Sequence, residues 1–140
     1  MDTIFLGRIP FKLKEKDKKL YDEYGKDAIE FAKRGQLLNA INLFDKILEE
    51  DPDVEFALVL KANNLFNHIS LNLNFDDIGS VDVKVIKNRA ENAKQQLQEC
   101  INLIERALKI NPINKEVEEL KKFISGTPLK GIEEILKNIN

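Results

Sequence analysis

Few residues of this 140-residue chain have side chains that could do chemistry. Cys100 is the single cysteine and His68 the single histidine, so an internal disulfide framework and a multi-histidine metal site are both excluded. Asp76 and Asp77 lack the alternating oxygen ligands and the closing glutamate of a calcium loop. The glycines are scattered and form no phosphate-binding loop. We therefore predict that the protein is not an enzyme and holds no metal and no cofactor.

The charge balance argues against nucleic acid as a partner. Lys and Arg total 22 and Asp and Glu total 24, giving a net charge of −2, whereas nucleic-acid binding favours a basic surface. The lysine-rich run 12–19 is broken by Glu15 and Asp17, which is typical of a solvated helix entry. The alternative is that this run binds an acidic partner or a phosphate backbone, together with Lys84, Lys87, Arg89 and Lys94.

No segment predicts membrane insertion or export. The longest apolar run, residues 56–60, is far shorter than the roughly 20 residues of a spanning helix. The N-terminus has no basic region before its short apolar stretch, unlike a signal peptide. We expect a cytoplasmic protein.

The elements that must position any functional surface are helices. Apolar residues recur with a 3.6-residue period, and glycine, proline and capping residues interrupt that period. Gly35 ends one predicted helix, and Pro52 and Pro112 follow two others. The predicted helices are 20–34, 37–50, 54–69, 82–110, 117–125 and 128–139.

The chain contains an internal repeat. Residues 40–52 and 100–112 align position by position, each with a small residue first, an apolar residue at matched places and a closing Asp-Pro or Asn-Pro. The first copy resembles the tetratricopeptide repeat, a helix–turn–helix unit. The matching residues are Tyr24, Ala28, Phe31, Gly35, Ala40, Phe44 and Pro52, with a departure at Asp27, where the family usually has leucine.

This resemblance implies a single domain, 1–140, with an all-α fold. The expected architecture is a right-handed superhelix of antiparallel helix pairs, in which repeat one spans 21–54 and repeat two spans 55–114. The second repeat carries an insertion at about 69–94, and helices within 115–140 cap the array. In family members that clamp acidic chaperone tails, Lys and Asn lie on the first helix. Gly25 and Ile29 occupy those positions here, and Leu60 occupies the matching asparagine position in the next repeat. An acidic chaperone tail is therefore not expected as a ligand.

The insertion allows two interpretations. Residues 71–75 alternate apolar and polar, and a heptad seam begins with Val83, Ile86, Ala90 and Ala93 and continues to Ala107. We prefer an extended segment that folds back over this seam, followed by a long helix with Ser80 as its N-cap. A β-hairpin with 81–85 as its second strand is the alternative.

The resemblance places one set of side chains on the concave side, where the first helices of the repeats lie. These predicted groove residues are Ile29, Phe56, Val59, Asn63 and Phe66. Because 56–60 is apolar all round, we expect this helix to be buried on both sides. The cover is either the chain itself, through 4–11 or the insertion, or a second copy, or a foreign peptide.

The predicted function is therefore a non-catalytic protein–protein interaction module, an adaptor that binds a partner segment in an apolar groove. The alternative is a self-assembling structural protein, a homodimer formed through the groove or through the long-helix seam at Val83, Ile86, Ala90 and Ala93.

Overall fold

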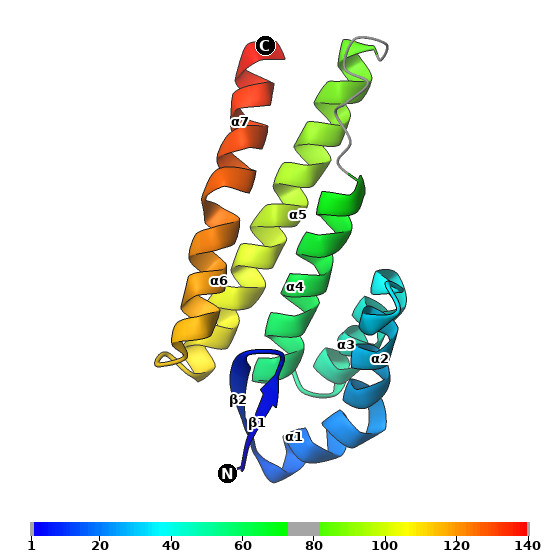
Figure 1. Cartoon of the computed structure of the whole chain (residues 1–140), viewed down its shortest axis with the longest axis vertical. Helices are drawn as coiled ribbons and strands as arrows, with labels where there is room; N and C mark the ends of the chain where they lie inside the picture. Colours follow the sequence, from blue (N-terminus) through cyan, green and yellow to red (C-terminus); the bar gives the residue numbers. More distant parts are fainter. Residues whose placement is uncertain (1, 73–81, 140) are drawn as a thin grey trace.

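The computed structural model describes residues 2–72 and 82–139, and it is predominantly helical (Figure 1). The helical elements are α1 (Glu15–Leu20), the π-helical turn η1 (Tyr21–Gly25), α2 (Lys26–Lys33), α3 (Leu37–Glu50), α4 (Glu55–Asn72), α5 (Val83–Ile110), α6 (Lys115–Ser125) and α7 (Thr127–Ile139). Two strands, β1 (Asp2–Leu6) and β2 (Ile9–Leu13), precede them.

The helices end close to the residues at which the sequence predicts helix ends. Gly35 follows α2, Pro52 follows α3, and the long helix runs over Val83–Ile110. The first helical run begins earlier than predicted, at Glu15, because the Lys14 N–H donates to the Asp17 carboxylate at 3.1 Å and closes its N-terminus. The N-cap of α5 is Asp82, which accepts a hydrogen bond from the Lys84 N–H at 2.9 Å. The predicted cap, Ser80, lies outside the described residues.

The predominantly helical structure agrees with the all-α prediction, but the N-terminus departs from it, because β1 and β2 form an antiparallel hairpin there. Phe11 and Leu13 alternate with exposed Lys12 and are buried in the main hydrophobic core. Ile4 and Leu6 pack against the same core. An alternation of apolar and polar residues over only ten residues is a weak signal for strands. The hairpin is therefore recognised from its packing against the core and was not predicted from the sequence.

The helices form a curved layer. α5 lies between α4 and the last two helices, while α2 and α3 lie on the other side of α4 (Figure 1). α6 and α7 follow each other end to end, with a bend at Gly126, and together run along α5. The hairpin lies at the lower end of α4, whereas α7 ends at the top of the view. The two ends of the chain therefore lie at opposite ends of the molecule (Figure 1).

The heptad seam is covered by the chain itself. Ile86, Ala90 and Ala93 are at most 7% exposed, and α7 runs along this half of α5. Val83 alone among the four seam residues is exposed, at 57%. The seam therefore stabilises the packing of one chain, and the prediction that it is a free face for a second copy is wrong for these three residues.

Both interpretations of the insertion need correction where the structure describes it. Leu71 belongs to the last turn of α4 and is not extended. Val83 and Val85 lie in the first turns of α5, so they cannot form the second strand of a hairpin. Residues 73–81, which would complete either interpretation, lie outside the described part of the chain.

Candidate functional site

The structure separates the five predicted groove residues into three groups. Phe56 and Val59 are fully buried. Phe66 is half-buried and makes an edge-to-face contact with Phe123 of α6, with ring centroids 5.6 Å apart. Ile29 and Asn63 line one shared pocket. Sequence register alone could not tell which of these five residues are covered and which stay open.

Phe56 and Val59 are buried because the N-terminal part of the chain covers the base of α4. Tyr21 of η1 packs edge-to-face on Phe56, with centroids 5.7 Å apart and an interplanar angle of 87°. A Cβ on Gly25 would lie 3.2 Å from the Phe56 ring and 2.9 Å from that of Tyr21, so a glycine is required for this approach. Burial of α4 on both sides is thus confirmed for residues 56–59, and the chain's own N-terminal segment supplies cover.

The open part of the groove is a pocket of about 550 Å³ lined by the hairpin, η1, α2, α3 and α4, which we call the groove pocket. Its size falls in the range of ligand-binding clefts. Its lining residues are Phe5, Leu6, Gly7, Tyr21, Ile29, Ala32, Lys33, Leu37, Phe44, Leu60, Asn63, Asn64 and Asn67.

The groove pocket joins an apolar floor to a wall of carboxamides on α4. Asn64 is buried and donates to the Leu60 carbonyl at 2.7 Å, whereas Asn63 is half-buried and Asn67 exposed. Asn63 and Asn67 make no hydrogen bond with any described residue, so their amides are free to donate and to accept. Lys33 is the one charged residue among the described residues that line this pocket. Sequence reasoning missed Asn64 and Asn67, although polar residues in a largely apolar helix were a usable signal.

The residues considered for catalysis lie elsewhere. Cys100 is buried, and this burial raises the pKa of its thiol to about 12. His68 is half-buried near the end of α4. Within residues 2–72 and 82–139, no group of three or more His, Cys, Asp or Glu side chains could hold a metal ion.

We expect the Cys100 thiol to be inert in the folded chain. Thiolate is the reactive form, and a pKa of about 12 leaves almost none of it near neutral pH. A thiol reagent such as iodoacetamide should label Cys100 only after unfolding in denaturant, as followed by intact mass. Complete labelling of the native protein within minutes would contradict the burial of this helix.

A second polar cluster lies at the lower end of α4, under strand β2. Glu55 is 4% exposed, and the Asn114 Nδ2 donates to the Glu55 carboxylate at 3.4 Å and to the Pro10 carbonyl at 2.8 Å. The Lys12 N–H also donates to Glu55, yet burial dominates and raises the pKa of this carboxyl. Asn114 Oδ1 is buried without a partner among the described residues.

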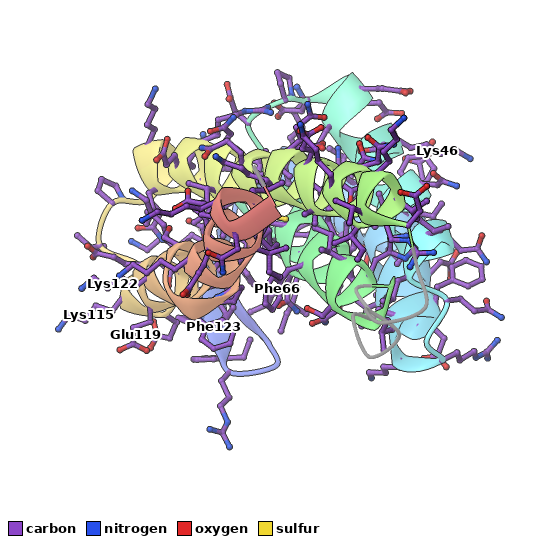
Figure 2. All side chains as sticks on the ribbon, turned by 90° about the horizontal axis from the view of Figure 1, so that it is seen from above. Lys46, Phe66, Lys115, Glu119, Lys122 and Phe123 are labelled. Atoms are coloured by element: carbon purple, nitrogen blue, oxygen red, sulfur yellow. The ribbon has the colours of Figure 1, made fainter. Side chains whose placement is uncertain are left out.

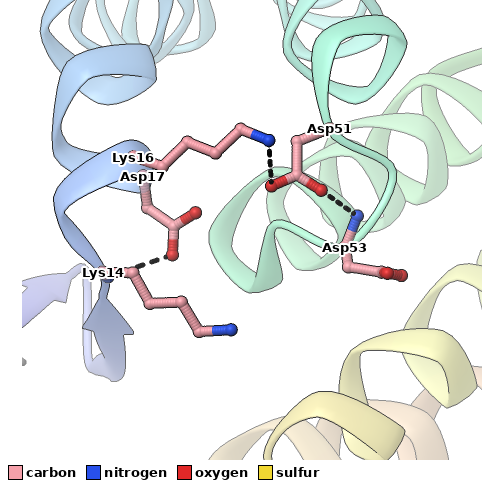
Figure 3. Close-up of polar contacts among 5 residues, drawn as sticks. All are labelled: Lys14, Lys16, Asp17, Asp51 and Asp53. Atoms are coloured by element: carbon pink, nitrogen blue, oxygen red, sulfur yellow. Dashed lines mark hydrogen bonds and ion pairs between the residues drawn. The ribbon is translucent and has the colours of Figure 1, made fainter.

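A small cavity of about 170 Å³ borders this cluster. Its charged lining residues are Lys12, Lys14, Asp17, Asp53 and Glu55. Figure 3 shows Lys14 extending between Asp17 and Asp53, while Lys16 pairs with Asp51 at 3.5 Å. Charges of both signs line this cavity, so its chemistry favours neither a cation nor an anion.

Substituting Glu55→Gln is expected to stabilise the chain near neutral pH. A carboxyl whose pKa is raised by folding contributes stability that is full below its unfolded pKa and is lost as pH rises through the folded pKa. Glutamine keeps an oxygen for the Lys12 N–H and adds an N–H donor beside Asn114 Oδ1. Urea unfolding should show an advantage of Glu55→Gln that grows as the pH rises above about 4, the ordinary pKa of a glutamate.

Glu55→Ala serves as the control, because it removes the acceptor as well as the charge. An advantage of Glu55→Gln that shrinks with rising pH would contradict the stated burial of Glu55.

The lysines considered for nucleic-acid binding do not form one surface. The 12–19 run lies near the hairpin, at the lower end of the molecule in Figure 1. Lys84, Lys87 and Lys94 belong to the N-terminal half of α5, which extends to the upper end. Within the run, Lys16 and Lys18 pair with acidic side chains. Figure 2 shows a separate group of charged side chains on α6, where Lys115, Glu119 and Lys122 lie near Phe123; this group mixes both signs.

Comparison with known proteins adds no relative. No family model, curated protein or solved structure matches the chain. None of the described helices is both long enough and apolar enough to cross a membrane.

Proposed function

We propose that this chain is a non-catalytic protein-interaction module, a tetratricopeptide-like adaptor that binds a segment of a partner protein in the groove pocket. The observation that carries the proposal is the pocket itself, with its apolar floor, its free carboxamides and its volume of about 550 Å³. The finer architecture, a superhelix of helix pairs in which α2 and α4 line the concave side, is part of the same proposal.

The helices from which the lining residues come support this architecture. In the resemblance, the first helix of each repeat faces the ligand. Ile29 comes from the first helix of repeat one and Asn63 from the first helix of repeat two, and both border the same pocket. Of the two second helices, α3 contributes Leu37 and Phe44 to the same lining, whereas α5 contributes no described residue to it.

The free energy of binding would come mainly from apolar contact. Phe5 is 70% exposed at the pocket edge, and Ile29 and Leu60 are half-buried in its floor. Burying apolar surface contributes about 25 cal/mol per Å², from which the cost of association must be subtracted. Asn63 and Asn67 would fix the register of the partner, because a carboxamide can bond both a backbone N–H and a backbone C=O.

Self-assembly is less well supported. Three of the four seam residues are already buried against the chain's own helices. The proposal therefore concerns a foreign segment, and light scattering of the full chain should report a monomer at micromolar concentration.

Site-specific photo-crosslinking tests the proposal. A photoreactive phenylalanine analogue would replace Asn67 in the pocket and, as a matched control, Asn102 on the exposed side of α5, in cells that express the chain. We expect a discrete crosslinked protein from position 67 that is absent from position 102. Equal crosslinking from both positions, or none from position 67, would refute the groove pocket as a binding site.

A further inference from the structure

The two edges of the N-terminal hairpin are treated differently by the rest of the chain. On the outer edge of β2, the Pro10 carbonyl accepts a hydrogen bond from Asn114 Nδ2 at 2.8 Å, and the Lys12 N–H donates to Glu55. Side chains therefore cap this edge. A strand edge left uncapped is a template for another extended chain.

The register shows which groups lie on the opposite edge. The two-residue turn Gly7–Arg8 has φ +67° at Gly7 and no positive φ at Arg8, as in a type II′ turn. In such a hairpin the pair next to the turn, Leu6 and Ile9, is hydrogen-bonded, and bonded pairs then alternate with non-bonded ones. The pair Phe5 and Pro10 is thus non-bonded, in agreement with the missing N–H of proline.

It follows that the N–H and C=O groups of Thr3 and Phe5 point away from β2. Among the described residues, none makes a hydrogen bond with these four groups. Phe5, Leu6 and Gly7 line the groove pocket, whereas Thr3 and the residues of β2 do not, so the uncapped edge of β1 meets the pocket at Phe5.

Two basic residues lie at or next to the described lining of the pocket. Lys33 lies in the lining, and Arg8 is exposed next to Gly7. Neither forms an ion pair with a described residue, and no carboxylate is among the described residues that line the pocket. These charges complement an acidic ligand group.

We propose that the occupant of the groove pocket is an extended, apolar peptide segment with an acidic residue, which adds to the outer edge of β1 as a third strand. Alternate side chains would enter the apolar floor, and the carboxylate would lie near Lys33. Asn63 and Asn67 would face the second edge of the added strand. This inference rests on the proposed function, which it deepens.

A single extended segment fits better than a second copy of this chain. A second β1 would bring its own β2 and α1 with it, and the rest of the described lining comes from η1, α2, α3 and α4, which would compete for that space. An isolated peptide strand meets no such obstruction.

The probe for the test is the tightest binder selected from a random dodecapeptide phage library with the full chain as bait. The key variant is Thr3→Pro, which removes an outward N–H and leaves the bonds between β1 and β2 intact. Thr3→Ala is the matched control, because it shortens the same side chain and keeps the N–H. Phe5→Pro is a second variant at the next outward position.

We expect Thr3→Pro to weaken peptide binding about three- to tenfold, the worth of one hydrogen bond, while Thr3→Ala leaves it unchanged. Amide hydrogen exchange gives a readout that does not depend on variants. In the free chain the Thr3 and Phe5 amides should exchange fast, and the peptide should slow both about tenfold or more, while Ile4 and Leu6 are protected throughout.

Three other results would overturn the inference. If Asn63→Trp weakens binding but the Thr3 and Phe5 amides stay unprotected, the peptide docks without strand addition and only the proposed function survives. If no selected peptide responds to Asn63→Trp, both proposals fail. If these amides become protected in the free chain as its concentration rises, a second copy occupies the edge.

Discussion

Replacing Phe56 by alanine is expected to lower the free energy of unfolding by about 3–5 kcal/mol. The ring is fully buried, contacts Tyr21 edge-to-face at 5.7 Å, and lies against the bare backbone of Gly25. Neighbouring side chains are also buried, so the site cannot collapse around the smaller residue. Equilibrium unfolding in urea, followed by circular dichroism, would measure the loss.

Phe5→Ala is the matched control for this experiment. It removes the same side chain from a position that is 70% exposed, and we expect a change within about 0.5 kcal/mol. Equal losses from the two variants would mean that the N-terminal segment does not cover α4, and the groove would then extend over Phe56 as its sequence register predicts.

Ala90→Glu is expected to cost about 3 kcal/mol or more, because it places an unpaired charge in a fully buried position of α5. Ala90 belongs to the seam that the chain's own helices cover, so the loss should appear as reduced stability of a monomer. Val83→Glu, on the same seam but 57% exposed, should leave stability nearly unchanged.

The same pair of variants separates an intramolecular seam from an intermolecular one. A seam between two copies would respond to Ala90→Glu by dissociation into folded monomers with undiminished helicity. Light scattering and circular dichroism on one sample distinguish these cases, and a dimer that Ala90→Glu splits without unfolding would contradict the packing described here.

The helical framework could be predicted from sequence because its signals are local. Gly35, Pro52 and Pro112 end or follow helices for reasons of backbone geometry that do not depend on distant residues. The seam residues of α5 repeat over many turns, so even a 28-residue helix was evident from its period.

The site was only partly predictable because it depends on distant packing. Ile29 and Asn63, which helix register predicts on one side of the array, border the same pocket. Phe56 and Val59 occupy the same face, but a hairpin and the turn η1 cover them, and neither is visible in the periodicity of α4. The capping of the β2 edge depends on the hydrogen bond between Asn114 and the Pro10 carbonyl, residues far apart in sequence, so the contrast with the uncapped edge of β1 was not predictable.

The most direct test of the central claim, that the groove pocket binds a partner segment, is calorimetric titration of the selected peptide into two variants. Asn63→Trp fills the pocket, whereas Asn102→Trp makes the same substitution at an exposed position of α5 outside it. We predict that Asn63→Trp weakens binding about 100-fold or more, close to 3 kcal/mol, and that Asn102→Trp binds like the unmodified chain. Equal affinity of both variants would contradict the account.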